Sequence, residues 1–215
     1  MRRLGWLVAL AAVAAGCVST EDQRLRDYND DGVRLFQHGA YGDAREEFQA
    51  ALTLKPNDPN LLYNVGECYD RLGQSDKAEQ TYRACLQQSP NHPETLHALT
   101  ALLVHQQRRG DADQLVQDWL HRQPKSADAY AEYAWLCGQD KDYPKALAAC
   151  ERAYELDPHD AHALNELGRL YEAVNRPDRA LAAYERSMEY DPKQADIGLC
   201  VSRLKAQGAG PPRPD

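Results

Sequence analysis

Motifs for chemistry are missing from this 215-residue sequence. It contains no G-x-S-x-G turn, no phosphate-binding glycine loop, no H-E-x-x-H and no C-x-x-C-H. Aspartate and glutamate are frequent, but they are spread along the predicted helices, which is typical of solvated faces rather than of a paired acid and base. We therefore expect a protein that is not an enzyme.

Positive charge is also in short supply. The chain has 25 Lys and Arg against 33 Asp and Glu, a net charge of −8, and no basic stripe. Proteins that bind nucleic acid need such a stripe, so we predict no nucleic-acid partner. The same composition argues against electrostatic attraction to anionic lipid, so membrane attachment would require an acyl group.

The six cysteines include no C-x-x-C pair. Five of them lie in the predicted helical region and are expected to be small core residues: Cys68, Cys85, Cys137, Cys150 and Cys200. The alternative is a disulfide between Cys137 and Cys150 across one helical hairpin, which an oxidising compartment would permit.

Histidines suited to chelation on one helix are absent. His97 and His105 stand eight residues apart, which is two turns and too far to hold one ion. His159 and His162 flank a predicted junction, where a loose metal site is conceivable, but surface histidines are far more common. We predict no metal and no cofactor apart from a covalent lipid.

Prolines recur with a fixed period of 34 residues. They stand at Pro56, Pro90, Pro124, Pro158 and Pro192. A period of this length is typical of stacked helical repeats, and each proline ends a unit because its ring cannot continue the preceding helix. Such arrays are usually surfaces for holding other proteins.

Small residues recur in three columns when each unit begins 31 residues before its proline. The eighth column holds Gly32, Gly66, Thr100, Ala134 and Gly168. The twentieth holds Ala44, Ala78, Ala112, Ala146 and Ala180. The twenty-seventh holds Ala51, Cys85, Trp119, Ala153 and Ser187. Small side chains there let two antiparallel helices approach closely.

This pattern resembles the tetratricopeptide repeat family. The resemblance implies an all-α fold, a right-handed superhelical solenoid of five helix-turn-helix repeats plus a C-terminal capping helix. The repeats are 25–58, 59–92, 93–126, 127–160 and 161–194, followed by the capping helix 195–207 and a disordered tail 208–215. Gly39, Gly73 and Asn175 fall where the first helix of a repeat should end in a left-handed conformation.

The third repeat fits the pattern least well. Thr100 replaces the small glycine, Val116 the aromatic residue and Trp119 the small residue of column 27, while Gly110 comes three columns late. We expect a local distortion of the stack in this repeat.

The N-terminal 16 residues resemble a bacterial lipoprotein signal peptide. Arg2 and Arg3 precede a short apolar run, and Ala14-Ala15-Gly16 precedes Cys17. Twelve apolar residues are too few to cross a bilayer, which takes about 20. We expect cleavage before Cys17, a lipid on that residue and a tether over 17–24.

The residue after Cys17 indicates which membrane the lipoprotein is anchored to. In many Gram-negative lipoproteins an aspartate after the lipidated cysteine retains the protein at the inner membrane, whereas this chain has Val18. The resemblance implies a protein anchored to the outer membrane and facing the periplasm.

The family's concave groove is lined by columns 2, 5, 6, 9, 12 and 13, which include Glu94, Asp128, Glu132 and His162 in the later repeats. Aromatic and amide side chains there could anchor an extended peptide. We expect an exposed Trp135 and a binding groove formed by Asn29, Phe36, Tyr63, Asn64, His97, Trp135, Asn165 and Arg169. Lysine is absent from these columns, which argues against recognition of a chaperone C-terminus.

The functional prediction is a non-catalytic adaptor or scaffold of the bacterial envelope. Its partner would be an envelope protein such as a secretin or another outer-membrane complex. Layout and size also resemble the pilotins of type IV pilus systems, small tetratricopeptide lipoproteins that help secretin rings to assemble. A second alternative is a redox-responsive or ligand-carrying envelope protein that uses its cysteines or histidines.

Overall fold

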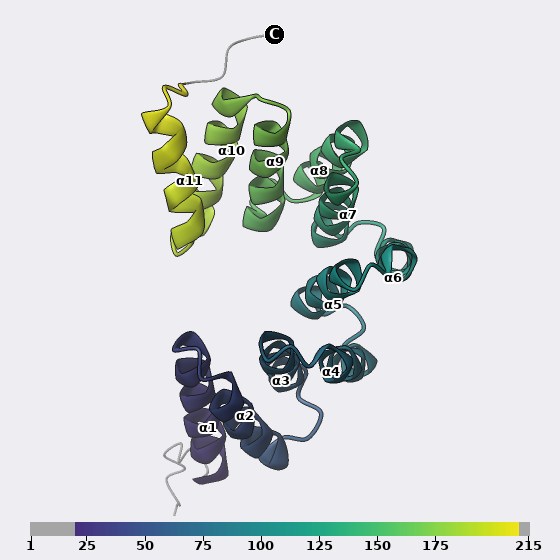
Figure 1. Cartoon of the computed structure of the whole chain (residues 1–215), viewed down its shortest axis with the longest axis vertical. Helices are drawn as coiled ribbons and strands as arrows, with labels where there is room; N and C mark the ends of the chain where they lie inside the picture. The colour runs from purple at the N-terminus through teal and green to yellow at the C-terminus, as the bar shows by residue number, and fades with distance from the viewer. Residues whose placement is uncertain (1–19, 211–215) are drawn as a thin grey trace, which may run out of the picture.

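The computed structural model describes residues 20–210. This part of the chain forms eleven α-helices in an open arc (Figure 1). They are α1 (Thr20–Gln37), α2 (Tyr41–Leu54), α3 (Pro59–Arg71), α4 (Ser75–Gln88), α5 (Pro93–His105), α6 (Arg109–Arg122), α7 (Ala127–Gln139), α8 (Tyr143–Leu156), α9 (Ala161–Ala173), α10 (Pro177–Tyr190) and α11 (Ala195–Ala206). The predicted fold class, five helix-turn-helix repeats plus a capping helix, is confirmed.

Each repeat ends and the next begins through the same local chemistry. The second helix of every repeat stops two residues before the periodic proline, as α4 does at Gln88 before Pro90. Two residues after the proline, a side chain caps the next helix. Asp58 accepts hydrogen bonds from the backbone N–H groups of Asn60 (3.0 Å) and Leu61 (3.2 Å). His92, Ser126 and Asp160 cap α5, α7 and α9 in the same way.

The turn inside each repeat contains one residue in the left-handed conformation. These residues are Gly39, Gly73, Gln107, Lys141 and Asn175, with φ between 58° and 78°. The expectation for Gly39, Gly73 and Asn175 is therefore confirmed. In the third repeat, however, Gln107 makes the turn, and Gly110 already lies inside α6.

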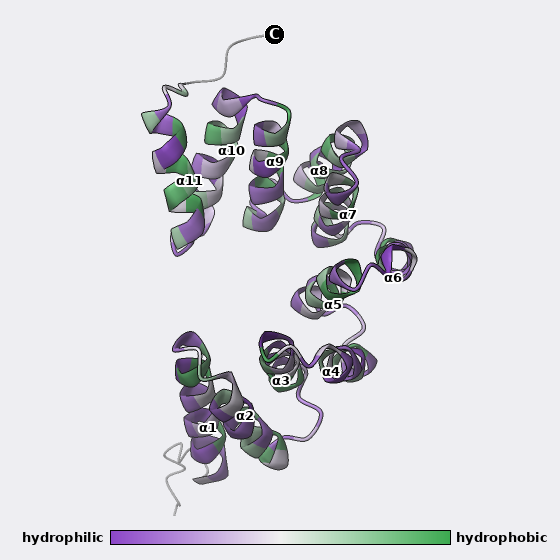
Figure 2. Cartoon of the chain, viewed as in Figure 1, coloured by the Kyte–Doolittle hydropathy of each residue, from purple (hydrophilic) through white to green (hydrophobic). Residues whose placement is uncertain are grey.

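In the middle of the arc, α3 and α5 lie on its inner side and α4 and α6 on its outer side (Figure 1). Hydrophobic and hydrophilic residues are mixed along every helix (Figure 2). Consistent with this mixture, none of the helices within residues 20–210 combines the length and apolarity that a membrane span requires.

In three repeats an aromatic ring packs directly onto a glycine. Phe48 faces Gly32, Tyr82 faces Gly66 and Tyr184 faces Gly168. A Cβ atom added at Gly66 would lie 2.5 Å from the Tyr82 ring, so no larger residue fits without a shift. This contact explains why column 8 carries glycine in these three repeats.

The third repeat is packed differently. Thr100 and Val116 are both fully buried in place of the glycine and the aromatic ring, and Trp119 is 2% exposed. Its helices α5 and α6 pack together less closely than the two helices of any other repeat. This wider spacing of α5 and α6 is the form that the predicted distortion takes.

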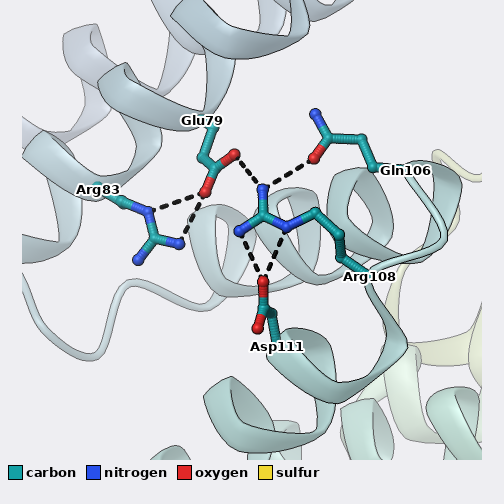
Figure 3. A network of polar contacts seen from close by, with 5 residues as sticks. All are labelled: Glu79, Arg83, Gln106, Arg108 and Asp111. Atoms are coloured by element: carbon teal, nitrogen blue, oxygen red, sulfur yellow. Dashed lines mark hydrogen bonds and ion pairs between the residues drawn. The ribbon is translucent and has the colours of Figure 1, made fainter.

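Ion pairs connect the third repeat to both neighbours. Arg108 donates to Glu79 of α4 (2.6 Å) and to Asp111 (2.8 Å), and Arg83 donates to the same Glu79 (2.7 Å; Figure 3). On the other side, Arg109 Nε donates to Asp140 at the end of α7 (3.1 Å).

The two ends of the array agree only in part with the boundaries predicted from the sequence. Ile197 and Leu204 of α11 are buried against the fifth repeat, so α11 is the capping helix. At the other end, α1 begins at Thr20, and residues 20–24 are therefore helical instead of belonging to an extended tether. The predicted disordered tail 208–215 starts with an ordered turn, in which the Ala209 N–H donates to the Leu204 carbonyl (3.1 Å). The signal peptide, Cys17 and residues 211–215 lie outside the described residues.

Candidate functional site

Two cavities lie along the first helices of the repeats. The smaller, of about 200 Å³, is formed by α1, α2 and α3. The larger, of about 280 Å³, is formed mainly by α5, α7 and α9. Tyr63 of α3 lines both, so the two cavities meet at this side chain.

The smaller cavity is mostly apolar. Its lining residues are Val33, Phe36, Gln37, Phe48, Tyr63, Asn64 and Glu67. Phe36 packs edge-on against Tyr41 (5.1 Å between ring centres) and lies 5.9 Å from the Arg71 guanidinium. Three of the predicted groove residues, Phe36, Tyr63 and Asn64, therefore come together here. Aromatic walls with two amides, Gln37 and Asn64, suit an apolar side chain of an extended peptide.

The larger cavity is acidic and contains two histidines. It is lined by Tyr63, Pro93, Glu94, His97, Trp119, Asp128, Glu132 and His162. Burial and the charge of Asp160 raise the pKa of the Asp128 carboxyl. The predicted residue His97 faces this cavity, together with groove-column residues that were not singled out.

His97 and Glu132 form the central pair of the larger cavity. The Nδ1 atom of His97 lies 2.7 Å from Oε2 of Glu132, whose side chain is 1% exposed. Burial tends to lower the pKa of His97, but the hydrogen bond and negative charge of Glu132 outweigh it and raise that pKa. The pair thus favours a positive charge beside the buried carboxylate.

Trp135 differs from its predicted exposed state. Its ring is half-buried, packs edge-on against His97 (5.3 Å between ring centres) and contacts the apolar cluster around α5 and α6. Trp135 lines neither cavity, and its place in the binding groove stays a prediction.

The remaining predicted groove residues are not part of either cavity. The Asn165 amide donates to Gln194, and Arg169 is paired with Glu166. Asn29 is half-buried on α1. The side chains of Asn165 and Arg169 therefore make intramolecular contacts in this structure.

The cysteines in the described region are all free thiols, and four of the five are buried. Cys137 and Cys150 share an apolar cluster without a disulfide between them. Burial raises the pKa of the Cys68 thiol to about 11 and also raises the pKa of Cys85, Cys137 and Cys150. Because thiolates are the reactive form, these positions fit core packing better than redox chemistry.

Family models match nearly the whole repeat region. Two models described as tetratricopeptide repeat match residues 134–205 and 101–161. A third, described as the cilia and flagella-associated protein 70 middle TPR-like domain, matches residues 37–129. The chain is a tetratricopeptide repeat protein. Repeats of this family are typically non-catalytic protein-binding units.

Relatives and solved structures agree with this assignment. Anaphase-promoting complex subunit 3 of Schizosaccharomyces pombe is 24% identical over 71% of this chain and 24% of its own length. A probable biofilm formation methyltransferase, WspC of Pseudomonas putida, is 33% identical over 41% of this chain and 23% of its own. The tetratricopeptide chain spans between 9% and 57% of the curated relatives it matches.

Two solved structures show the same fold. A thermophilic tetratricopeptide protein of Thermus thermophilus, TTC0263, is 22% identical, with a TM-score of 0.67 over 85% of this chain and 99% of that one. PilF of Pseudomonas aeruginosa is 17% identical, with a TM-score of 0.57 over 88% of this chain and 86% of that one. At these identities the likeness concerns the fold alone.

Proposed function

We propose that this tetratricopeptide protein is a lipid-anchored adaptor of the bacterial envelope that holds an extended segment of a partner protein. The observation that carries the proposal is the apolar cavity of about 200 Å³ formed by α1, α2 and α3, with Tyr63 and Asn64 in its wall. An apolar side chain can fill the cavity while the amide of Asn64 pairs with the partner's main chain.

The adaptor role can be tested at Val33. This side chain is 38% exposed and lines the apolar cavity, so Val33→Arg would place a charge where the partner should insert an apolar group. We expect a partner that co-purifies with the tagged wild type from detergent-solubilised envelopes to be lost from the variant, as measured by quantitative mass spectrometry.

Leu72 provides a matched control. It is also 38% exposed, but it lies at the end of α3 and lines neither cavity. Leu72→Arg should therefore retain the partner. Equal retention by both variants, with unchanged helicity by circular dichroism, would contradict a partner site in this cavity.

Anchoring rests on the N-terminal sequence. Residues 1–16 followed by Cys17 resemble a lipoprotein signal, and Val18 favours the outer membrane. Cys17→Ser should move the protein from the membrane pellet to the soluble fraction, and metabolic labelling with a palmitate analogue should disappear. Labelling that persists in the variant would rule out Cys17 as the lipidated residue.

A pilotin-like role is the second candidate. The lipoprotein-like N-terminus and the fold shared with PilF support it. In that case the protein enriched by the wild type and lost from Val33→Arg should be a secretin, and deletion of the gene should reduce the amount of secretin multimer in outer-membrane fractions. Enrichment of a different envelope protein would favour the general adaptor.

A further inference from the structure

Three side chains of the larger cavity meet at one point although they come from three repeats. His97 lies on α5, Glu132 on α7 and His162 on α9, so consecutive inner helices contribute one residue each. One potential ligand atom from each residue lies within 4.8 Å of the others, and no other such group of three occurs within residues 20–210. The curvature of the array brings these side chains together.

One carboxylate oxygen of Glu132 lacks a hydrogen-bond partner within the described residues. Its side chain is 1% exposed, and Oε2 is paired with His97, but Oε1 is buried without a hydrogen-bond partner among the described residues. A buried carboxylate oxygen left without a partner is costly, because it loses its hydration and gains nothing in return. A cation in the cavity would supply the missing interaction.

Glu166 shows how the same position is satisfied elsewhere. It occupies column 6 of the fifth repeat, as Glu132 does in the fourth, and is almost as buried, with 4% of its side chain exposed. Arg169, one turn further along α9, pairs with it. In the fourth repeat no arginine follows Glu132 at this spacing, because the corresponding residue is Trp135.

The surroundings of the three residues also suit a small cation. Glu94 and Asp128 line the same cavity, and neither Lys nor Arg is among its lining residues. An anion would be repelled by these carboxylates, whereas a cation would be attracted. Trp135 and His162 both pack edge-on against His97, with ring centres 5.3 and 5.8 Å away, and limit the motion of its imidazole.

We propose that His97, Glu132 and His162 bind one divalent transition-metal ion of the zinc class. Two imidazoles and one carboxylate form a donor set that Zn²⁺ prefers, whereas Mg²⁺ and Ca²⁺ prefer oxygen ligands alone. Ligands of a tetrahedral zinc ion lie about 3.4 Å apart, given bonds of about 2.1 Å. Side-chain rotations that move the ligand atoms by about 1 Å would therefore complete the site without movement of the helices.

Three protein ligands leave one coordination position open. Asp128 lines the same cavity one turn before Glu132, so its carboxylate or a water molecule could occupy that position. The site would connect the third, fourth and fifth repeats through one ion. It would thereby stiffen the part of the array that begins with the third repeat, whose two helices are the most widely spaced. This proposal does not depend on the adaptor role.

The test uses the full-length protein in detergent, titrated with Zn²⁺ by calorimetry. We expect one zinc ion per chain, and binding at least about tenfold weaker in both His162→Ala and Glu132→Gln. His159→Ala is the matched control: this exposed histidine lies near the same junction but packs against Tyr190. Its zinc affinity should equal that of the wild type.

Cobalt distinguishes the proposed site from the cysteines. Co²⁺ held by imidazole and carboxylate gives visible ligand-field bands without the near-ultraviolet thiolate band that cysteine ligands produce. The proposal is overturned if the wild type fails to take up one equivalent, if a thiolate band appears, or if His162→Ala binds as the wild type does. Should Glu132→Gln fail to fold by circular dichroism, the result for His162→Ala decides.

Discussion

The second and third repeats fill the same space between their two helices with different side chains. In the second repeat Gly66 leaves room for the fully buried ring of Tyr82. In the third repeat Thr100 and Val116 stand at those positions. The apolar volume therefore shifts toward the helix ends, where Trp119 replaces a small residue.

The comparison shows that one repeat pattern permits two ways of packing. The second repeat depends on close approach of its helices around a glycine. The third depends on one large side chain and on arginines that reach neighbouring repeats, because its own helices pack less closely. Array stability is a sum over such neighbour interactions, so each repeat should respond to a different set of substitutions.

The largest effect is expected for Trp119→Ala. The indole is 2% exposed, contacts the cluster around Leu96, and donates its N–H to Gln123 (3.0 Å). Loss of such a side chain costs about 3–5 kcal/mol in free energy of unfolding. Urea unfolding followed by circular dichroism would measure it.

Trp135→Ala is the matched control for that change. Its indole is half-buried against His97, so the same substitution should cost clearly less. Equal losses for the two tryptophans would mean that Trp119 has no special role in the third repeat.

The residues in the repeat columns predicted these packing differences, but the sequence did not predict every turn residue. Prolines, small residues and left-handed turn residues define where helices end, because each acts locally. The residues that depart from the family pattern, Thr100, Val116 and Trp119, identified the third repeat as the one that is packed differently. By contrast, Gln107 and Lys141 adopt the left-handed conformation without the glycine or asparagine that would reveal it.

The metal-ligand set was also not predicted from sequence, although its members all occupy groove columns. His97, Glu132 and His162 belong to columns 5, 6 and 2 of three different repeats. Their distance depends on how successive repeats are rotated against one another, which no local pattern specifies. The occurrence of His and Glu in the groove columns of consecutive repeats is the signal from which these three residues could have been predicted.

A second prediction concerns the glycine of the second repeat. Gly66→Ala would put a Cβ atom 2.5 Å from the buried Tyr82 ring and should destabilise the protein by about 1–3 kcal/mol. Thermal and urea unfolding would measure the change. Tyr82→Val imitates the third repeat and is itself destabilising, but Gly66→Ala should cost less in that background than in the wild type.

Gly42→Ala makes the same chemical change without a steric conflict. Gly42 lies in the first turn of α2, and an added Cβ would meet nothing within 4 Å. Its replacement should be neutral or stabilising by up to about 1 kcal/mol, since alanine favours helices. A loss at Gly42 as large as at Gly66 would show that helix propensity, and not the tyrosine, governs the result.

The smallest effect is expected for the ion pairs that connect the third repeat to the second. Hydrogen bonding from Arg108 lowers the pKa of Glu79, with Arg83 adding to the effect. Because the folded-state pKa lies below the unfolded value of about 4.3, the network stabilises the fold above that pH. This contribution is lost as pH falls through the lowered folded-state pKa, so Glu79→Gln should flatten the decline of stability between about pH 5 and pH 3.

Solvent screening keeps the expected size of this effect near 0.5–1 kcal/mol, because Arg83 and Arg108 are 53% and 39% exposed. Glu46→Gln is the control, since Glu46 is 71% exposed and pairs with the neighbouring Arg45. Urea midpoints of wild type and both variants, measured across this pH range, give the slopes. A slope changed equally by both substitutions would assign the effect to overall charge instead of to the link between the second and third repeats.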